Sequence, residues 1–337
     1  MAGTLHGFGL GVASKNAKGD VLDVFYPTPL ANISGDLVSI FDGVSGELKA
    51  TEIRALSDGL RSAGEHALAD IAVRLSEAGR PVVASLLADN AAPQTVADAY
   101  LKLHLLSHRL IKPHGTDLTG MFALLPNVAW TDEGPIDLAE LADRQLTSRL
   151  KGRVLEVASV DKFPKMTNYV VPSGVRIAHT ARVRLGAYLG SGTTVMHEGF
   201  INFNAGTDGP GMIEGRISAG VMVGKGSDLG GGCSTMGTLS GGGNIIISVG
   251  ESCLLGANAG LGIPLGDRCT VEAGLFVTAG TKVTVLDDAR EAVETLAARH
   301  LSGKSDLLFR RNSQSGSVEC LTNQTAIELN ESLHDNN

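Results

Sequence analysis

The chain has 337 residues, a formal net charge of −8 and an aromatic content of only 4%. This length allows two or three domains with a sizeable core. The acidic balance argues against non-specific binding to nucleic acid or to anionic membranes. No apolar run approaches the roughly 20 residues of a membrane span, and the N-terminal residues lack the basic and apolar regions of a secretory signal. We therefore expect a cytoplasmic protein.

Four cysteines are present, at positions 233, 253, 269 and 320, without a CxxC pair or metal-ligand spacing. Reduced, partly buried thiols are the expected state in a cytoplasmic protein.

Residues 1–130 are expected to form an α/β domain. Residues 21–26 alternate polar and apolar side chains as a strand does, and residues 37–41 are predicted as a second strand. Helices follow, the first of them beginning after Thr51 as its N-cap and the next covering residues 63–78.

The clearest helical pattern covers residues 95–111, and Pro113 ends it. His104 and His108 lie one helical turn apart on it. Because no third ligand or neighbouring glutamate accompanies them, histidines satisfied in the core or by solvent are favoured over a metal pair.

Residues 131–172 are expected to connect this domain to the rest of the chain. Residues 138–150 are predicted as a helix, residues 155–160 as a strand and residues 161–165 as a loop.

An aliphatic residue returns at every sixth position over much of residues 173–286. Ile177, Val183, Leu189, Val195 and Ile201 follow one another in unbroken sixes, and the period returns at Val249 and again at Leu265, continuing to Val283. Short repeats of this kind build a parallel β-helix, in which each coil stacks on the last and buries an aliphatic column.

Two stretches break the period, residues 202–211 and residues 238–244. Both are expected to leave the coil as insertions. Since a rigid solenoid holds such loops in place, chemistry is expected at them, and more so at the first, which is rich in polar residues.

Residues 287–337 are expected to close the open end of the array. The pattern near Val293 favours a strand, residues 307–313 and 317–320 resemble a hairpin, and residues 325–333 are predicted as a short helix.

Glu214 is the best candidate for a base. It is followed by Gly215, which leaves room for a substrate, and by Arg216, which can hold a carboxylate ionised or bind an anion. Glu198 lies at a nearby coil position. A surface ion pair is about as probable for Glu214 on the sequence alone.

Two glycine runs, residues 230–232 and 241–243, offer backbone N–H groups that can hold a thioester oxyanion or the amides of pantetheine. The string at residues 224–227 lacks the spacing of a phosphate-binding loop. Cys233 is expected to be inert, because the sequence places no histidine beside it.

Residues 310–313, Arg-Arg-Asn-Ser, form a compact basic patch. Adjacent arginines on a strand face opposite sides, so one can pair internally while the other meets a phosphate. Ion pairs with acidic residues are the alternative for both.

Four strings together resemble the tetrahydrodipicolinate N-succinyltransferases, in the longer branch found in pseudomonads and actinobacteria. They are residues 196–207 (MHEGFINFNAGT), 214–220 (EGRISAG), 230–234 (GGGCS) and 255–260 (LGANAG). The likeness extends over nearly the whole chain, including residues 101–109. The first string is far more specific than the repeats alone, which indicate only hexapeptide-repeat acyltransferases.

The resemblance implies a homotrimer of left-handed parallel β-helices with active sites between subunits. It implies succinyl transfer from succinyl-CoA to the amino group of ring-opened tetrahydrodipicolinate, in the diaminopimelate route to lysine. Glu214 would be the catalytic carboxylate, as general base or acyl carrier, and we prefer the base. The resemblance also implies substrate and CoA contacts at Arg216, Gly231, Ser234, Ala257, Glu272, Ala273, Gly280, Arg310, Arg311, Asn312 and Ser313.

Relatives of this kind place Mg²⁺ on the trimer axis, using the position of Glu198 and an aspartate where this chain has Ala181. The alanine removes half of that ligand set, which argues against a metal, although a ring of three Glu198 carboxylates could still attract a cation. The alternative function is a hexapeptide-repeat acetyltransferase that acts on another amine or hydroxyl with His197 as base.

Overall fold

The computed structural model describes residues 4–237 and 245–322, and the chain divides into two compact units. The first unit comprises residues 1–111, 115–164 and 168–170, and the second comprises the remaining residues from 112 onward. Within the described ranges, no helix is long and apolar enough to cross a membrane.

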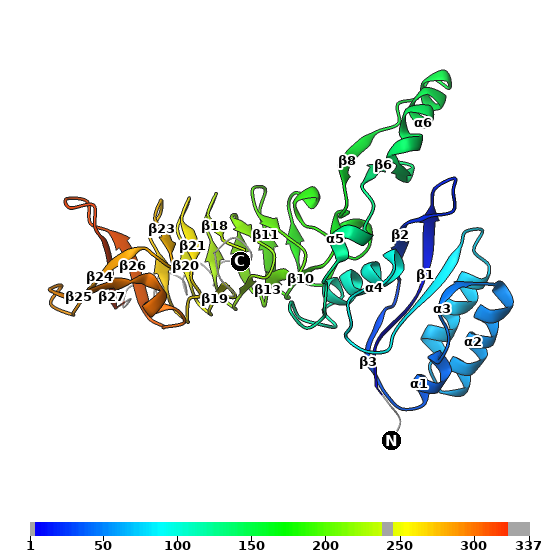
Figure 1. Ribbon diagram of the computed structural model, residues 1–337, viewed down its shortest axis with the longest axis horizontal. Coiled ribbons are helices and arrows are strands. Elements are labelled where there is room, and N and C mark those ends of the chain that lie inside the picture. The colour runs from blue at the N-terminus through cyan, green and yellow to red at the C-terminus, as the bar shows by residue number, and fades with distance from the viewer. Residues whose placement is uncertain (1–3, 238–244, 323–337) are drawn as a thin grey trace. The chain divides into compact units, whose positions relative to one another are not determined.

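An antiparallel sheet of five strands forms the middle of the first unit (Figure 1). Strand β1 pairs with β2, β3 and β5, and β4 pairs with the outer side of β5. The strands are β1 (Leu5–Lys15), β2 (Val21–Phe25), β3 (Leu30–Ile33), β4 (Gly46–Leu48) and β5 (Val82–Leu87).

Helices cover both faces of this sheet (Figure 1). On one face, Phe8 and Leu10 of β1 join an apolar core with Phe41, Ile53 and the other buried residues of α1, α2 and α3. On the other face, α4 packs closely because β1 carries glycines there; a Cβ on Gly9 would lie 2.8 Å from Cδ1 of Leu101. The helices are α1 (Asp36–Phe41), α2 (Ala50–Ser62), α3 (His66–Ser76), α4 (Val96–Ser107) and α5 (Met121–Leu124).

Two local expectations for this unit are wrong. Residues 37–41 lie in helix α1, because a short apolar run has no periodicity that separates a buried helix from a strand. The N-cap of α2 is Lys49, whose backbone N–H donates to the Glu52 carboxylate at 2.7 Å, so the helix begins before Thr51.

Helix α4 has Thr95 as its N-cap. The hydroxyl of Thr95 accepts from the backbone N–H of Asp98 at 3.1 Å, and the Asp98 carboxylate accepts from the N–H of Thr95 at 3.0 Å. The helix ends at Ser107, four residues before the predicted end at residue 111, so Pro113 does not determine where it ends.

His104 is fully buried and satisfied by the backbone. Its Nδ1 lies 2.8 Å from the carbonyl of Tyr100, and its Nε2 accepts from the N–H of Tyr26 at 3.2 Å. The ring of His108 stacks beside it at 5.9 Å. The expectation of a core histidine is confirmed for His104.

A three-stranded antiparallel sheet and one helix follow in the first unit. The helix predicted over residues 138–150 is confirmed as α6, whose N-cap Asp137 accepts from the N–H of Ala139 at 2.9 Å. The predicted strand is present two residues later than its expected start. The elements are β6 (Val128–Thr131), β7 (Gly134–Asp137), α6 (Leu138–Leu150) and β8 (Val157–Asp161).

The second unit is built from three parallel sheets that the chain visits in rotation. We name these sheets the first, second and third face. The first face holds β9 (Arg176–Ile177), β11 (Thr193–Val195), β14 (Gly211–Ile213), β17 (Asp228–Leu229), β20 (Leu254–Leu255), β22 (Thr270–Val271) and β26 (Leu307–Arg311). The second face holds β12 (Phe200–Ile201), β15 (Arg216–Ile217), β18 (Ser234–Thr235), β21 (Gly260–Gly262) and β23 (Phe276–Thr278). The third face holds β10 (Ala187–Leu189), β13 (Ala205–Thr207), β16 (Met222–Val223) and β19 (Ser248–Val249).

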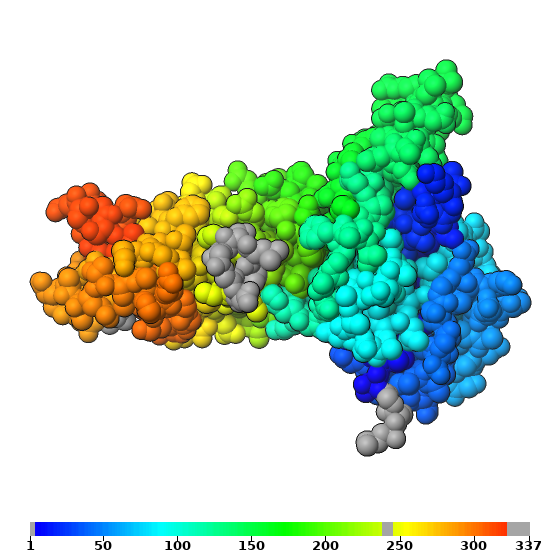
Figure 2. Space-filling view, in the orientation of Figure 1, coloured from blue at the N-terminus to red at the C-terminus, as the bar shows by residue number. Residues whose placement is uncertain are grey.

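The six-residue period is confirmed as the step from one face to the next. Leu189, Val195 and Ile201 end strands on the third, first and second face in turn, and each is fully buried. Stacked coils place these residues in aliphatic columns inside the unit. The coils follow one another in the order of the sequence (Figures 1 and 2).

The first expected insertion is wrong. Residues 205–207 form β13, paired in register with β10 on one side and β16 on the other, and residue 211 begins β14. Thr207 occupies the aliphatic position with only 1% of its surface exposed. Its hydroxyl bonds to that of Thr193 at 2.5 Å, so a polar residue fills the core position and hides the period. The second stretch, residues 238–244, lies outside the described residues.

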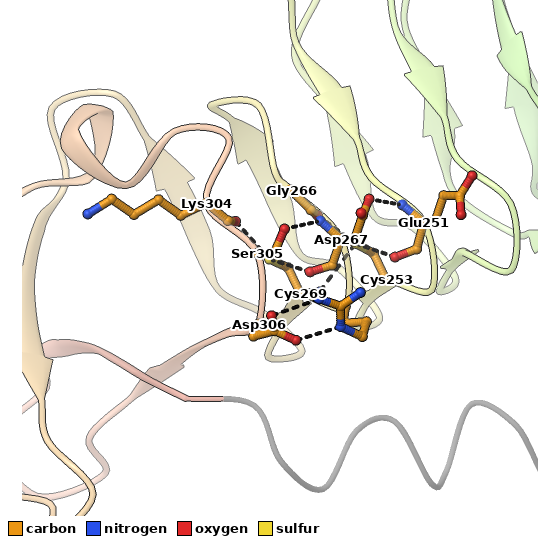
Figure 3. A network of polar contacts seen from close by, with 9 residues as sticks. Glu251, Cys253, Gly266, Asp267, Cys269, Lys304, Ser305 and Asp306 are labelled. Atoms are coloured by element: carbon orange, nitrogen blue, oxygen red, sulfur yellow. Dashed lines mark hydrogen bonds and ion pairs between the residues drawn. The ribbon is translucent and has the colours of Figure 1, made fainter.

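All four cysteines are free and buried, as expected. Ser227, Cys253 and Cys269 occupy the same position in successive coils, at the corner between the third and first faces, and form a ladder of hydrogen bonds. The Ser227 hydroxyl donates to the Gly250 carbonyl at 2.6 Å and accepts from the N–H of Cys253 at 2.8 Å. One coil on, the Cys253 thiol donates to the Gly266 carbonyl at 3.1 Å and accepts from the N–H of Cys269 at 3.3 Å (Figure 3). The Cys253 thiol therefore makes the same pair of hydrogen bonds as the Ser227 hydroxyl.

The C-terminal end agrees with expectation where it is described. A strand includes Val293, and residues 307–311 and 318–322 form an antiparallel hairpin. The helix expected over residues 325–333 lies outside the described residues. The remaining elements are β24 (Lys282–Leu286), β25 (Ala292–Ala297), β27 (Val318–Thr322) and the 3₁₀ turns η1 (Met166–Asn168), η2 (Thr180–Arg182) and η3 (Ala298–Leu301).

Candidate active site

The corner between the first and second faces is two residues short in one coil. Five residues separate Val195 from Ile201 and five separate Leu229 from Thr235, but only Glu214, Gly215 and Arg216 separate Ile213 from Ile217. The strands on both sides keep their register, so the short coil is drawn in at this corner.

A cavity of about 400 Å³ lies at this short corner. Residues of the neighbouring coils complete its wall. The lining residues are Arg182, Glu198, Phe200, Glu214, Gly215, Arg216, Gly232 and Cys233. The structure therefore brings together Glu214, Arg216 and Glu198, three of the residues named from the sequence.

Gly215 lets the short corner pack on the coil that follows it. A Cβ at this position would lie 2.3 Å from Sγ of Cys233, 2.7 Å from the Cys233 carbonyl and 3.1 Å from the Gly230 carbonyl. Burial raises the pKa of the Cys233 thiol to about 12, so near neutral pH it is a protonated packing group.

Arg216 is fixed on the outer side of the second face. Its Nε and Nη2 donate to the Ser234 hydroxyl at 3.1 and 2.7 Å. Residue 216 lies between Phe200 and Ser234 in the strand register, and its side chain is exposed. A guanidinium held in this way presents its remaining N–H groups to an anion without a large loss of side-chain entropy.

Arg182 fixes the corner that carries Glu198. Its Nε and Nη2 donate to the backbone carbonyl of Glu198 at 3.3 and 2.9 Å. Ala181 provides no ligand atom, and the described part of the chain contains no group of three or more His, Cys, Asp or Glu residues that could hold a metal. A single chain therefore does not fit the Mg²⁺ site that the resemblance implied.

Small residues continue from the cavity along the same corner. Gly231, Ala257 and Ala273 occupy equivalent positions in three successive coils, and both alanines are exposed. The N–H of Asn258 donates to the Gly231 carbonyl at 2.9 Å, and that of Gly274 donates to the Ala257 carbonyl at 2.8 Å. The stack leaves a strip without large side chains that leads away from Glu214.

The basic patch lies one coil beyond Ala273. Arg310 pairs with Glu319 at 2.8 Å, whereas Arg311 is exposed and donates from Nη1 to the Gly316 carbonyl at 3.0 Å. The expectation that one arginine pairs internally is confirmed. The carboxylate of Glu272 accepts from the N–H of Arg311 at 2.7 Å, which ties the patch to the neighbouring coil.

Asn312 also bonds to Glu319, the partner of Arg310. Its side-chain amide donates to Glu319 at 2.7 Å, and these hydrogen bonds from Asn312 and Arg310 lower the pKa of Glu319. Ser313 is exposed in the hairpin turn.

Gly280 is placed apart from the other named residues. It follows β23, so it lies after the second-face strand of its coil, whereas Gly231, Ala257 and Ala273 lie before theirs. Nothing lies within 4 Å of its Cβ position. His197, the base of the alternative function, is exposed and does not line the cavity. The second glycine run, residues 241–243, lies outside the described residues.

Sequence reasoning missed Arg182 and Phe200 in the wall of the cavity. The signal that points to them is the four-residue step from Ile213 to Ile217, which breaks the period and marks the corner. The broken period was instead interpreted as an insertion at residues 202–211.

Two family models match the chain. Residues 125–165 match the middle region of tetrahydrodipicolinate N-succinyltransferase, and residues 246–279 match the hexapeptide repeat of succinyl-transferase.

Full-length relatives agree with these matches. The chain is 63% identical to a 2,3,4,5-tetrahydropyridine-2,6-dicarboxylate N-succinyltransferase of Pseudomonas aeruginosa over 100% of both chains. It is 58% identical to a protein of the same name from Vibrio cholerae over 98% of both. A solved structure from Campylobacter jejuni, described as a 2,3,4,5-tetrahydropyridine-2-carboxylate N-succinyltransferase, superposes with a TM-score of 0.86 at 33% identity, covering 96% of this chain and 93% of that one. The chain belongs to the tetrahydrodipicolinate N-succinyltransferase family.

Proposed function

We propose that the chain transfers the succinyl group of succinyl-CoA to the amino group of ring-opened tetrahydrodipicolinate, in the diaminopimelate route to lysine. The family membership supports this reaction. The observation that carries the choice of site is the cavity at the short corner, where Glu214 and Arg216 lie together.

Glu214 acts as the general base in this proposal. It takes a proton from the ammonium form of the acceptor, and the nitrogen lone pair then attacks the thioester carbon. As the tetrahedral intermediate collapses, the nitrogen releases its second proton to solvent and the C–S bond breaks. The CoA thiolate leaves with the proton returned by Glu214. An acyl-carrier role would need a covalent glutamyl intermediate, which direct attack by an amine does not require.

Arg216 binds a carboxylate of the acceptor or of the succinyl group. Its guanidinium is exposed and held by Ser234, so it can make paired hydrogen bonds to a planar carboxylate. The N–H groups of Gly231 and Gly232 are the candidates for holding the thioester oxyanion, because the N–H of Gly230 already donates to the Leu255 carbonyl at 2.8 Å.

CoA follows the strip from Gly231 through Ala257 and Ala273 toward Arg311. The strip is supported by its lack of large side chains, and the exposed Arg311 and Ser313 offer donors for phosphate at its end. Glu272, Arg310 and Asn312 support this end through their hydrogen bonds to Arg311 and Glu319. Gly280 remains a proposed contact from the resemblance alone.

The proposal includes a homotrimer of left-handed parallel β-helices with active sites between subunits. The hexapeptide match and the parallel three-sheet coil support the β-helix. The proposal also includes four parts of the chain: an α/β domain (residues 1–130), a connecting segment (131–172), the β-helix (173–286) and a C-terminal segment that closes it (287–337).

The test supplies succinyl-CoA or acetyl-CoA together with the amino-oxopimelate acceptor and measures release of the CoA thiol. Succinyl-CoA should be preferred, and Glu214→Gln should lower kcat by roughly 10²- to 10⁴-fold. Glu251→Gln, at an exposed glutamate on a different corner, is the matched control. Preference for acetyl-CoA together with full activity of Glu214→Gln would refute the proposal.

A further inference from the structure

Glu198 and Glu214 each have a carboxylate oxygen near one position beside Gly231. That position is where a Cβ atom would stand on Gly231, 3.5 Å from Oε2 of Glu214 and 4.0 Å from Oε2 of Glu198. Because both distances are measured from the same position, the two oxygens lie no farther apart than the sum of these distances, and a small group that approaches Gly231 passes beside both carboxylates.

Backbone conformation does not require a glycine at position 231. Its φ is not in the left-handed region, unlike that of its neighbour Gly232, at 71°. No described backbone or packing atom would touch its Cβ within 4 Å, since the two carboxylate oxygens are the atoms found there. The missing side chain therefore leaves space beside two acids rather than relieving strain or a clash.

The nearby arginines are held by neutral partners. Arg182 donates to the backbone carbonyl of Glu198, and Arg216 donates to the hydroxyl of Ser234. Across residues 4–237 and 245–322, no basic side chain forms an ion pair with the carboxylate of Glu198 or Glu214. Two carboxylates beside one position, each without a paired cation, form a site of negative potential that attracts a positively charged group.

An ammonium group suits this site better than a metal ion. Magnesium requires six oxygen ligands near 2.1 Å in octahedral geometry, and the described residues contain no cluster with even three metal-binding side chains. An ammonium group has three N–H donors and is satisfied by two carboxylates and one water or carbonyl.

We infer that Glu198 binds the amino group of the acceptor in its ammonium form, beside Glu214. This inference rests on the proposed function, because the acceptor of that reaction carries a primary amine. Glu198 contributes binding and selectivity, whereas Glu214 alone takes the proton. The two arginines supply positive charge for carboxylates, so the cavity matches the alternating charges of an amino dicarboxylate.

Binding of two matched ligands tests the inference without turnover. Pimelate and 2-aminopimelate share the seven-carbon dicarboxylate and differ by the amino group, and their dissociation constants are measured by calorimetry on the full chain. Glu198→Gln should weaken binding of 2-aminopimelate at least about tenfold, as expected for loss of a charged hydrogen bond. It should leave pimelate within about twofold.

Kinetics provide a second readout. In Glu198→Gln, the KM for the amino-oxopimelate acceptor should rise and the KM for succinyl-CoA should not. Glu251→Gln is again the control, and the thermal unfolding midpoint of each variant shows whether it folds. Equal weakening of both ligands, or of neither, would overturn the inference while leaving succinyl transfer by the unmodified chain intact.

A metal role gives a different pattern. If EDTA removes the preference of the unmodified chain for 2-aminopimelate over pimelate and Mg²⁺ restores it, Glu198 acts through a cation and the inference is wrong.

Discussion

Sγ of Cys233 lies 2.3 Å from the position that a Cβ atom would take on Gly215, so the short corner and the coil beneath it fit together only without a side chain there. The same corner carries Glu214, and its packing therefore sets where the proposed base lies.

Gly215→Ala should disturb both stability and catalysis. The added methyl also meets the carbonyl oxygens of Cys233 and Gly230 at 2.7 and 3.1 Å, so the backbone must move. Overpacking of this kind costs about 1–3 kcal/mol. We expect a lower midpoint in urea and a fall in kcat as Glu214 shifts. Gly79→Ala, with ordinary φ and open space around its Cβ, should change neither.

Ser234→Ala should raise the KM for a carboxylate-bearing substrate. The hydroxyl orients Arg216 through two hydrogen bonds, and without it the guanidinium samples more conformations. The loss is expected to be roughly 1 kcal/mol, or about fivefold in KM. Steady-state kinetics with both substrates measure it. Unchanged KM values for both would show that Ser234 does not position Arg216.

The Cys253 thiol should be replaceable by a hydroxyl but not by a methyl. Cys253→Ser keeps a donor for the Gly266 carbonyl and an acceptor for the N–H of Cys269, as Ser227 does one coil earlier. Cys253→Ala leaves both backbone groups unsatisfied inside the unit, which costs about 1–3 kcal/mol. Chemical denaturation compares the two variants. Equal stability of both would contradict the ladder.

Acid should destabilise the first unit through His104. Desolvation by burial lowers the pKa of His104 to about 3 from its ordinary value of 6.5. The unfolded chain takes up a proton as the pH falls through 6.5, and the folded chain does not until the pH approaches 3. Stability is therefore fully present above pH 6.5 and is lost between 6.5 and 3, by up to about 1.4 kcal/mol per pH unit.

Protonation of His104 would also place a second ring proton on Nε2, against the N–H of Tyr26 that donates to this atom. Denaturation of His104→Gln between pH 7.5 and 5 is the check. The variant should be less stable at pH 7.5 yet lose less stability on acidification. A slope equal to that of the unmodified chain would rule out His104 as the group responsible.

Much of this protein follows from local sequence patterns. The period that runs through Val195 and Ile201 determines the coil, because each sixth residue must be buried on the next face. Helix α6 and the β26–β27 hairpin are predicted for similar reasons, since amphipathic spacing and a polar turn act over a few residues.

Local sequence patterns do not explain positions at which a residue distant in the sequence determines which side chain fits. Strand β1 has glycine at every second position from residue 7 to 11. A Cβ on Gly7 or Gly9 would meet Leu105 or Leu101 of α4, and a Cβ on Gly11 would meet Phe25 and Tyr26, so only the packed structure explains this pattern. Thr207 is accepted in an aliphatic column because Thr193, in the coil before, provides a hydrogen-bond partner.

The sequence by itself determined the family, the coil and Glu214 as the first residue to test. Only the tertiary structure decided which residues meet Glu214. Stacking brings positions two coils apart, such as Glu198 and Gly231, to the same corner, and the loss of two residues after Ile213 opens the cavity in the coil between them. The six-residue period predicts where the chain turns from one face to the next. It does not predict the cavity, because the cavity depends on how adjacent coils of unequal length pack.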